Sequence, residues 1–172
     1  MEHIEIVFTR SKKKIKILSD LIIWYTKKPY SHVARGFNAF SGKVQMYYQA
    51  SEGKVNYESK EVFDHKHEIV KKYILQIPKE LYTEIGIACM QDSGKKYGVM
   101  QNLGIVLVDL GICKDTPWKD GRNCSELIYL KVFKNLIPSL QENPDTIKPQ
   151  RIEEIIMEYF KETDNVWELI KA

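Results

Sequence analysis

The sequence predicts an α+β domain in which an antiparallel sheet packs against helices. The order of its segments is the main reason: an opening strand and one helix precede a group of segments with strand character and then a group with helical periodicity. Length and composition are the second reason, since 172 residues with 44% hydrophobic side chains can bury one substantial core. We therefore expect residues 1–172 to form a single domain.

The start of the chain combines a strand with an amphipathic helix. Residues 3–9 (HIEIVFT) have the composition of a strand. Apolar residues then recur at helical spacing and predict a helix over about 14–27; they are Ile15, Leu18, Ile22 and Tyr25. Pro29 ends this helix, because proline cannot continue the helical hydrogen-bond ladder.

Three further segments have strand character. Residues 31–37 (SHVARGF) and 44–50 (VQMYYQA) flank a polar stretch with Ser41-Gly42, which suits a hairpin connection. Residues 69–77 (IVKKYILQI) are rich in β-branched and aromatic side chains, which favours another strand.

The second half of the chain is mainly helical. Helices are expected over residues 78–91, 98–112, about 124–136 and about 149–160. Asp92-Ser93-Gly94 interrupts the pattern after the first, and the second should be strongly buried because it is so apolar. Pro149 can open the last helix, since proline fits a first helical turn. The tail VWELI (166–170) adds a final strand.

Charge limits the kinds of partner. The 26 basic and 23 acidic side chains leave a net charge of only +3, which does not require a nucleic acid or an anionic membrane. Basic residues do cluster near the start, but a cluster of this size is typical of a solvated loop or helix start; they are Arg10, Lys12, Lys13, Lys14 and Lys16. We therefore expect no nucleic-acid partner.

Signals for export, membrane insertion and cofactors are not visible. The first residues carry Glu2 and Glu5 and lack an apolar core of signal-peptide length. The apolar stretch from Gly104 to Cys113 is interrupted by Asp109 and falls short of the roughly 20 residues that a membrane span requires. We expect a cytoplasmic protein with reduced thiols and no cofactor, because the sequence has no phosphate-binding loop, dinucleotide fingerprint or zinc-ligand spacing.

Cys124 differs from the other cysteines in its surroundings. Asn123 is a favoured helix cap, and Glu126 lies three positions later, where its carboxylate can bond back to the cap amide. Cys124 would then occupy the first helical position, where unsatisfied amides and the helix dipole favour thiolate over thiol. The same amides stabilise an oxyanion when a thiolate attacks a carbonyl. Cys89 and Cys113 lie in apolar runs, as small buried hydrophobes do.

A catalytic thiol needs a base, and neutral imidazole accepts a proton at about pH 7. The chain has four histidines. His3 is close to the terminus, and His65 and His67 lie in the charged stretch FDHKHE, which we expect to be a solvated loop. His32 lies inside a predicted strand, so it is the best placed of the four for a rigid site.

The imidazole in turn needs an acceptor that orients it. If Phe37 pairs with Val44 in the predicted hairpin, His32 lies opposite Gln49 on the same face of the sheet. Glu52 is the alternative, and it reaches that face only through a one-residue register slip or a bulge. We prefer Gln49, although an amide orients the ring less strongly than a carboxylate because it lacks charge.

Four segments resemble, in order, the circularly permuted NlpC-type papain-like cysteine hydrolases of the YiiX-like group. Residues 9–37 (TRSKKKIKILSDLIIWYTKKPYSHVARGF) resemble the opening of the family, in which a strand and a helix lead into a Tyr-Ser-His-Val-type strand. MYYQASEGKV (46–55) resembles the next strand, GKKYG (94–98) the segment before a buried helix, and RNCSELIY (122–129) the nucleophile helix. The histidine precedes the cysteine, as permutation implies, and the resemblance covers residues 3–137.

This resemblance implies a permuted papain-like fold with the nucleophile at a helix N-terminus. It assigns Cys124 as nucleophile and His32 as base, and Gln49 falls where the family often has glutamate. The activity implied is that of a thiol hydrolase (a peptidase or amidase) that cleaves an amide or ester bond through a thioacyl intermediate. The substrate classes are a peptide, a cell-wall-type peptide and an acyl lipid. Two alternatives stay open: acyl transfer of the lecithin-retinol acyltransferase type, and a binding module on the same fold.

Overall fold

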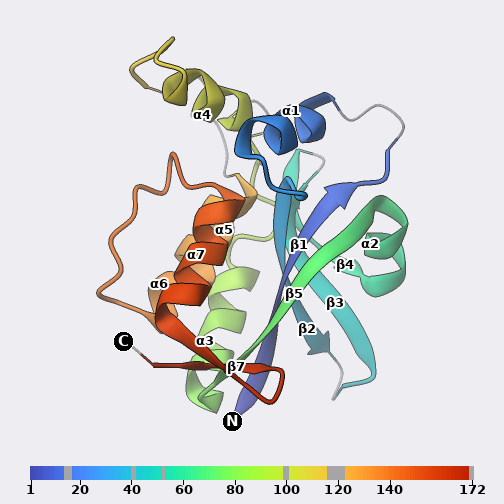
Figure 1. The fold of residues 1–172 in the computed structure, drawn as a ribbon. Coiled ribbons are helices and arrows are strands. Elements are labelled where there is room, and N and C mark those ends of the chain that lie inside the picture. Colours follow the sequence, from blue (N-terminus) through green and yellow to red (C-terminus); the bar gives the residue numbers. More distant parts are fainter. Residues whose placement is uncertain (14–16, 40–41, 52, 99–100, 116–122, 171–172) are drawn as a thin grey trace.

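A seven-stranded mixed sheet organises the fold (Figure 1). The computed structural model describes residues 1–13, 17–39, 42–51, 53–98, 101–115 and 123–170. The strands are β1 (Glu2–Ser11), β2 (His32–Ala39), β3 (Val44–Ser51), β4 (Lys54–Ser59), β5 (His67–Ile77), β6 (Phe160–Thr163) and β7 (Val166–Leu169). They lie in the order β4-β3-β2-β1-β5-β7-β6.

The α+β class is confirmed, but the sheet is not wholly antiparallel as predicted. Among the described strands, every neighbouring pair is antiparallel except β5 and β7, which run parallel. The parallel contact arises because the chain leaves the sheet after β5, passes through a series of helices, and returns at the edge as the β6–β7 hairpin. A parallel pair needs such a long crossover connection.

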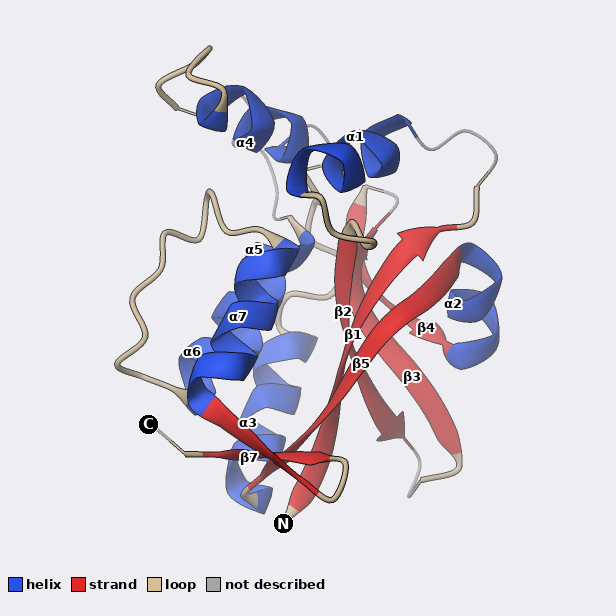
Figure 2. Ribbon diagram, viewed as in Figure 1, coloured by secondary structure: helices blue, strands red, loops and turns tan. Residues whose placement is uncertain are grey.

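Helices cover both faces of the sheet (Figure 2). One face carries α3 (Lys79–Met90), α7 (Pro149–Tyr159) and the consecutive α5 (Cys124–Ile128), η1 (Tyr129–Phe133) and α6 (Lys134–Leu136), in which η1 is a π-helical turn. The other face carries the short α2 (Lys60–Lys66). The helices α1 (Ile17–Thr26) and α4 (Gln101–Asp109) lie next to each other at one end of the sheet. Within the described residues, none of the helices is long and apolar enough to cross a membrane.

The central strand β1 is buried on both faces, which explains why its sequence is almost continuously apolar. Ile4, Ile6 and Phe8 are fully buried in the main core, beneath α3, α5 and α7. Val7 points to the opposite face. There it joins a smaller core under α2; the other members are Ala34, Tyr47 and Phe63.

The predicted solvated loop FDHKHE is wrong. These residues form most of α2 and the beginning of β5. Ser59 caps α2 by accepting a hydrogen bond from Val62 N at 3.4 Å, and Phe63 is fully buried against the sheet. The stretch is highly charged but still folds, because one apolar side chain per helical turn is enough to hold so short a helix on the sheet.

Three other elements differ from the predictions. The predicted helix over 98–112 is α4, which ends at Asp109, and the residues that follow it are exposed, so "strongly buried" is wrong for this part of the chain. The single predicted helix over 124–136 contains the π-helical turn η1. The final strand is confirmed as β7, but its hairpin partner β6 was not predicted.

Glu153 anchors α7 to the sheet. Its carboxylate accepts hydrogen bonds from Tyr30 Oη at 2.5 Å, Tyr73 Oη at 2.8 Å, Lys71 Nζ at 2.6 Å and Lys28 Nζ at 3.2 Å. Burial of Glu153 opposes its charge, but these four donors outweigh that effect and lower its pKa to about 2. The two tyrosines are almost fully buried, so this carboxylate joins α7 to two buried side chains outside the helix.

Replacing Glu153 by Gln should reduce the free energy of unfolding by about 1–3 kcal/mol, because an amide cannot satisfy two lysines and two buried hydroxyls. The depressed pKa of Glu153 means that its stabilisation is complete above its ordinary pKa of 4.5 and is lost as the pH falls towards about 2. Urea unfolding across this range should therefore show the wild type and Glu153→Gln converging at low pH. A difference that does not depend on pH would contradict this account.

Candidate active site

The N-terminus of α5 carries Cys124 and is closed by a reciprocal cap. Asn123 Oδ1 accepts a hydrogen bond from Glu126 N at 2.7 Å, and Glu126 Oε2 accepts one from Asn123 N at 3.4 Å. The predicted capping box is confirmed, and Cys124 occupies the first helical position. Gln101, at the start of α4, donates from Nε2 to Glu126 Oε2 at 3.3 Å, which ties this helix end to α4.

His32 is the first residue of β2 and is held from two sides. It pairs with Thr9 of β1, and the preceding Ser31 donates its backbone N–H to Thr9 O at 3.0 Å. The Ser31 hydroxyl lies 2.6 Å from the hydroxyl of Ser19 in α1. The entry into β2 is therefore fixed by both β1 and α1, and the position of the imidazole with it.

Gln49 of β3 accepts a hydrogen bond from His32 Nε2 at 2.8 Å. The register that suggested this partner is nevertheless wrong, because Val44 pairs with Ala39 and not with Phe37. The true register is shifted by two residues, so the two side chains meet diagonally across the strands. A shift of two residues keeps every side chain on the same face of the sheet, and for that reason the predicted contact still forms.

A buried carboxylate lies behind Gln49. Gln49 Nε2 donates to Glu58 Oε2 at 2.8 Å, while Glu58 Oε1 accepts from Lys66 Nζ at 2.7 Å and Asn56 Nδ2 at 3.2 Å. Because an ionised carboxylate can only accept, Gln49 presents its amino group to Glu58 and its carbonyl to His32. His32 must therefore carry its proton on Nε2, which leaves Nδ1 as the basic nitrogen of the neutral ring.

The thiol of Cys124 interacts directly with this ring. The Cys124 and His32 side chains lie close enough for the charge of each to shift the pKa of the other, and the backbone N–H of Val33 lies close to the sulfur. Since Nε2 of His32 is engaged by Gln49, Nδ1 is the nitrogen available to the thiol. The structure thus brings the three predicted site residues into one chain of contacts, from Cys124 through His32 to Gln49.

The electrostatics of the pair favour charge separation. Burial is the largest influence on Cys124 and opposes its ionisation, but the charge of His32 and the hydrogen bonds outweigh it and lower the pKa of the thiol. Burial likewise opposes the charged form of His32, whereas Cys124, Gln49 and Glu58 favour it and raise the pKa of the ring. A lowered thiol pKa and a raised imidazole pKa together favour a thiolate–imidazolium pair.

A second histidine stacks on the candidate base. The rings of His67 and His32 lie 5.1 Å apart with an angle of 15° between their planes. His67 also stacks with Phe63 of α2 at 4.7 Å, and its Nδ1 lies 3.5 Å from Thr9 Oγ1. The ring of His32 is thereby packed against the aromatic residues of the α2 face. This contact was not predicted, because His67 was expected in a solvated loop.

Glu58 was also missed, although the sequence contained a usable signal. In KVNYES (54–59) the apolar Val55 and Tyr57 alternate with the polar Asn56 and Glu58, which is the pattern of a strand with one polar face. Recognising that strand beside the one with Gln49 would have placed both polar side chains on the same side of a hairpin.

The remaining candidates have separate outcomes. Glu52, the alternative to Gln49, lies outside the described residues. Cys89 is fully buried as expected; burial raises the pKa of its thiol, although Arg35 Nη1 donates to the sulfur at 3.4 Å. Cys113 is partly exposed, so the expectation that it is buried is wrong. In the part of the chain that the structure describes, no three His, Cys, Asp or Glu side chains converge as a metal site would require.

Comparison with known protein families, with curated proteins and with solved structures finds no match for this chain. The geometry of Cys124, His32, Gln49 and Glu58 is therefore the basis for the chemistry proposed below.

Removing the imidazole should raise the pKa of Cys124, because burial of the thiolate is then unopposed by a nearby positive charge. The pH dependence of iodoacetamide alkylation, with the modified cysteine identified by mass spectrometry, measures this shift. For His32→Ala the midpoint at Cys124 should move to higher pH than in the wild type. The matched control His65→Ala removes an exposed histidine from α2 and should leave it in place. An unchanged midpoint in His32→Ala would show that the ring does not stabilise the thiolate.

Neutralising the carboxylate behind Gln49 should lower the pKa of His32, since the charge of Glu58 helps to keep the imidazolium protonated. In Glu58→Gln the ring should therefore lose its proton at lower pH than in the wild type, as followed by NMR of the imidazole. Glu61→Gln, which removes an exposed carboxylate from the neighbouring α2, is the control. Equal titration of His32 in both variants would contradict a role for Glu58.

Proposed function

We propose that this protein is a thiol hydrolase in which Cys124 attacks an amide or ester carbonyl and His32 moves the proton. The observation that carries the proposal is the continuous, directed chain from Cys124 through His32 and Gln49 to Glu58. Glu58 sets the orientation of the Gln49 amide, and Gln49 sets which nitrogen of His32 carries the proton. The result is a thiol of lowered pKa beside a ring with one basic nitrogen. A nucleophile, its base and an orienting acceptor are the three parts that covalent acyl chemistry requires.

A permuted papain-like fold is part of this proposal. Its support is the placement of the nucleophile at the start of a helix that packs on a largely antiparallel sheet, with the base on a strand of that sheet. The histidine strand also precedes the cysteine helix in the chain, as a permuted arrangement requires. The mutual pKa shifts of thiol and ring, which require the two groups to be close, support an enzyme over a binding module on an inactive fold, because such a module has no need to hold them together.

The proposed reaction has two stages. In the first, the Cys124 sulfur bonds to the carbonyl carbon, and the proton held by His32 passes to the leaving amine or alcohol as its bond to that carbon breaks. In the second, His32 Nδ1 takes a proton from water, the resulting hydroxide attacks the thioester, and the carbon–sulfur bond breaks. Gln49 and Glu58 act throughout as positioning residues, because they hold the proton of the ring on Nε2.

The helix end also supplies donors for the oxyanion. Amide N–H groups at the start of α5 point towards the region of the thiol, as they do at any helix N-terminus. Asn123 adds a second donor: its Nδ2 is buried, and no acceptor among the described residues bonds to it. A buried amino group without a partner is costly, and the oxygen of a bound carbonyl would satisfy it.

Access is the main constraint on this chemistry. Cys124 is 1% exposed and His32 is 9% exposed. The carbonyl can approach the sulfur only after neighbouring side chains move, so catalysis includes an opening step before the attack. The same burial keeps bulk water from the thiolate and strengthens its pairing with the imidazolium.

Incubation with activated acyl esters should leave an acyl group on Cys124, detectable as a mass increase and by peptide mapping. Cys124→Ala should carry no acyl group, and His32→Ala should be acylated about 10²–10⁴-fold more slowly, the usual contribution of a general base. Cys113→Ser serves as the matched control, because it removes a more accessible thiol and should be acylated like the wild type. Acylation that follows Cys113 and not Cys124 would refute the assignment of the nucleophile.

A further inference from the structure

Two neighbouring helices at one end of the molecule are almost entirely apolar. Among its ten residues, α1 (ILSDLIIWYT) carries a single charge, Asp20, and among its nine, α4 (QNLGIVLVD) carries only Asp109. A helix at a protein–water surface normally places polar side chains on its outer side. A helix that is apolar all round is usually buried in protein or in lipid.

Part of α1 and the residues that follow α4 are nonetheless exposed. Ile17 and Trp24 of α1 are 78% and 72% exposed, and they lie seven positions apart, on one side of the helix. Leu110 and Ile112, which directly follow α4, are 54% and 66% exposed. We refer to these four side chains as the outer apolar surface. Two belong to α1 and two to the chain directly after α4, and α1 and α4 lie at the same end of the molecule (Figure 1).

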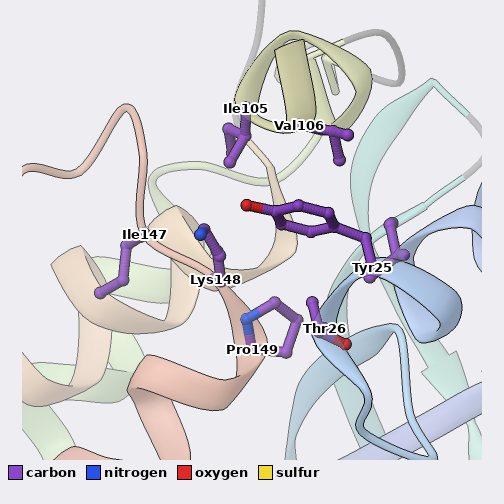
Figure 3. A pocket seen from close by; sticks show the side chains of 8 residues that line it. Tyr25, Thr26, Ile105, Val106, Ile147, Lys148 and Pro149 are labelled. Carbon is purple, nitrogen blue, oxygen red and sulfur yellow. The ribbon is translucent and has the colours of Figure 1, made fainter. Parts of the chain in front are cut away.

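The inner sides of the two helices are already occupied. The ring of Tyr25 lies between them (Figure 3), and its hydroxyl donates to Asp109 Oδ2 at 2.9 Å. Asp109 also pairs with Lys148, so the single charge of α4 has partners in this protein. A small apolar pocket remains between α1, α4 and the start of α7; Ile22, Ile105, Val106 and Pro149 contribute to its lining. Internal packing therefore does not account for the outer apolar surface.

The chain around α1 is strongly basic. Residues 10–28 contain seven lysine or arginine residues and one acidic residue, a net charge of +6. The whole chain has a net charge of +3, so the remainder is net negative. Lys12 and Lys27 are exposed on either side of α1, and Lys114 is exposed just beyond Ile112. Arg10 and Lys28 are paired with Glu68 and Glu153, so the positive charge next to the outer apolar surface comes from the other basic residues of this segment and from Lys114.

We infer that the outer apolar surface, on α1 and directly after α4, docks this protein on an anionic lipid bilayer. Aliphatic side chains gain free energy at the acyl boundary, tryptophan favours the interface, and flanking lysines are attracted to anionic head groups. A second copy of the chain fits less well, because its own +6 segment would face this one. Nucleic acid would match the charge but would leave Ile17, Leu110 and Ile112 in water.

Docking would bring the candidate active site to the membrane surface. α1 is joined to the residue before His32 by the Ser19–Ser31 hydrogen bond, and α4 is joined to the α5 cap by the contact between Gln101 and Glu126. The two helices therefore contact residues next to His32 and Cys124, one helix on each side. The docking inference itself does not rest on the proposed chemistry, and it can be tested with a catalytically dead variant.

Flotation with lipid vesicles tests the inference. The wild type and Cys124→Ala should both float with phosphatidylcholine vesicles that contain about a third phosphatidylglycerol, and much less with pure phosphatidylcholine. Raising the salt from about 0.1 M to about 0.5 M NaCl should release much of the bound protein. The double variant Ile17→Ala/Trp24→Ala should bind at least about tenfold more weakly, and Lys27→Glu about fivefold or more weakly.

Matched controls are available on other faces. Ile87 of α3 and Met157 of α7 are 48% and 57% exposed, and Ile87→Ala/Met157→Ala should float like the wild type. The inference is overturned if the wild type ignores anionic vesicles or if this control loses as much binding as Ile17→Ala/Trp24→Ala. It is also overturned if light scattering shows a dimer that Ile17→Ala/Trp24→Ala dissociates. The salt and lipid comparisons use the wild type alone, so they decide the matter even if a variant unfolds.

Discussion

The carboxylate of Glu58 determines the direction of every hydrogen bond that leads to Cys124. It can only accept, so Gln49 must donate to it and accept from His32, and the proton of the ring is confined to Nε2. Without this fixed direction, Gln49 could rotate and donate to the ring instead, and the basic nitrogen would face away from the thiol. Having Gln49 as the orienting residue in place of a glutamate therefore does not remove the negative charge from the site, because Glu58 supplies that charge from behind Gln49.

Burial has opposite consequences at the two buried carboxylates. Around Glu153, four donors stabilise the carboxylate and join α7 to its surroundings. Each carboxylate oxygen accepts two hydrogen bonds, so none of its lone pairs is left for a ligand. Around Glu58, the donors include Gln49. Because Gln49 donates to Glu58, its carbonyl oxygen faces His32 and orients the ring beside Cys124. Both groups are charged in a low-dielectric setting, and each is stabilised by at least three hydrogen-bond donors. The Glu153 network stabilises the fold, and the Glu58 network orients the proposed catalytic base.

Much of the fold and part of the site followed from local patterns. The helix cap at Asn123, the hairpin of β2 and β3, and the last helix opening at Pro149 depend on residues a few positions apart, so the sequence predicted them. β4, α2 and β6 were missed because they are short and one of them is highly charged. The two-residue error in the hairpin register did no harm, since it left His32 and Gln49 on the same face.

The sequence by itself determined that Cys124 begins a capped helix and that His32 lies on a strand, because caps and strand periodicity are local. Only the tertiary structure decided that these two side chains meet, that His67 stacks on the ring and that Glu58 stands behind Gln49. Such contacts join residues from separate elements, some of them far apart in the chain, and are selected by how the sheet and helices pack as a whole. No local pattern carries that information.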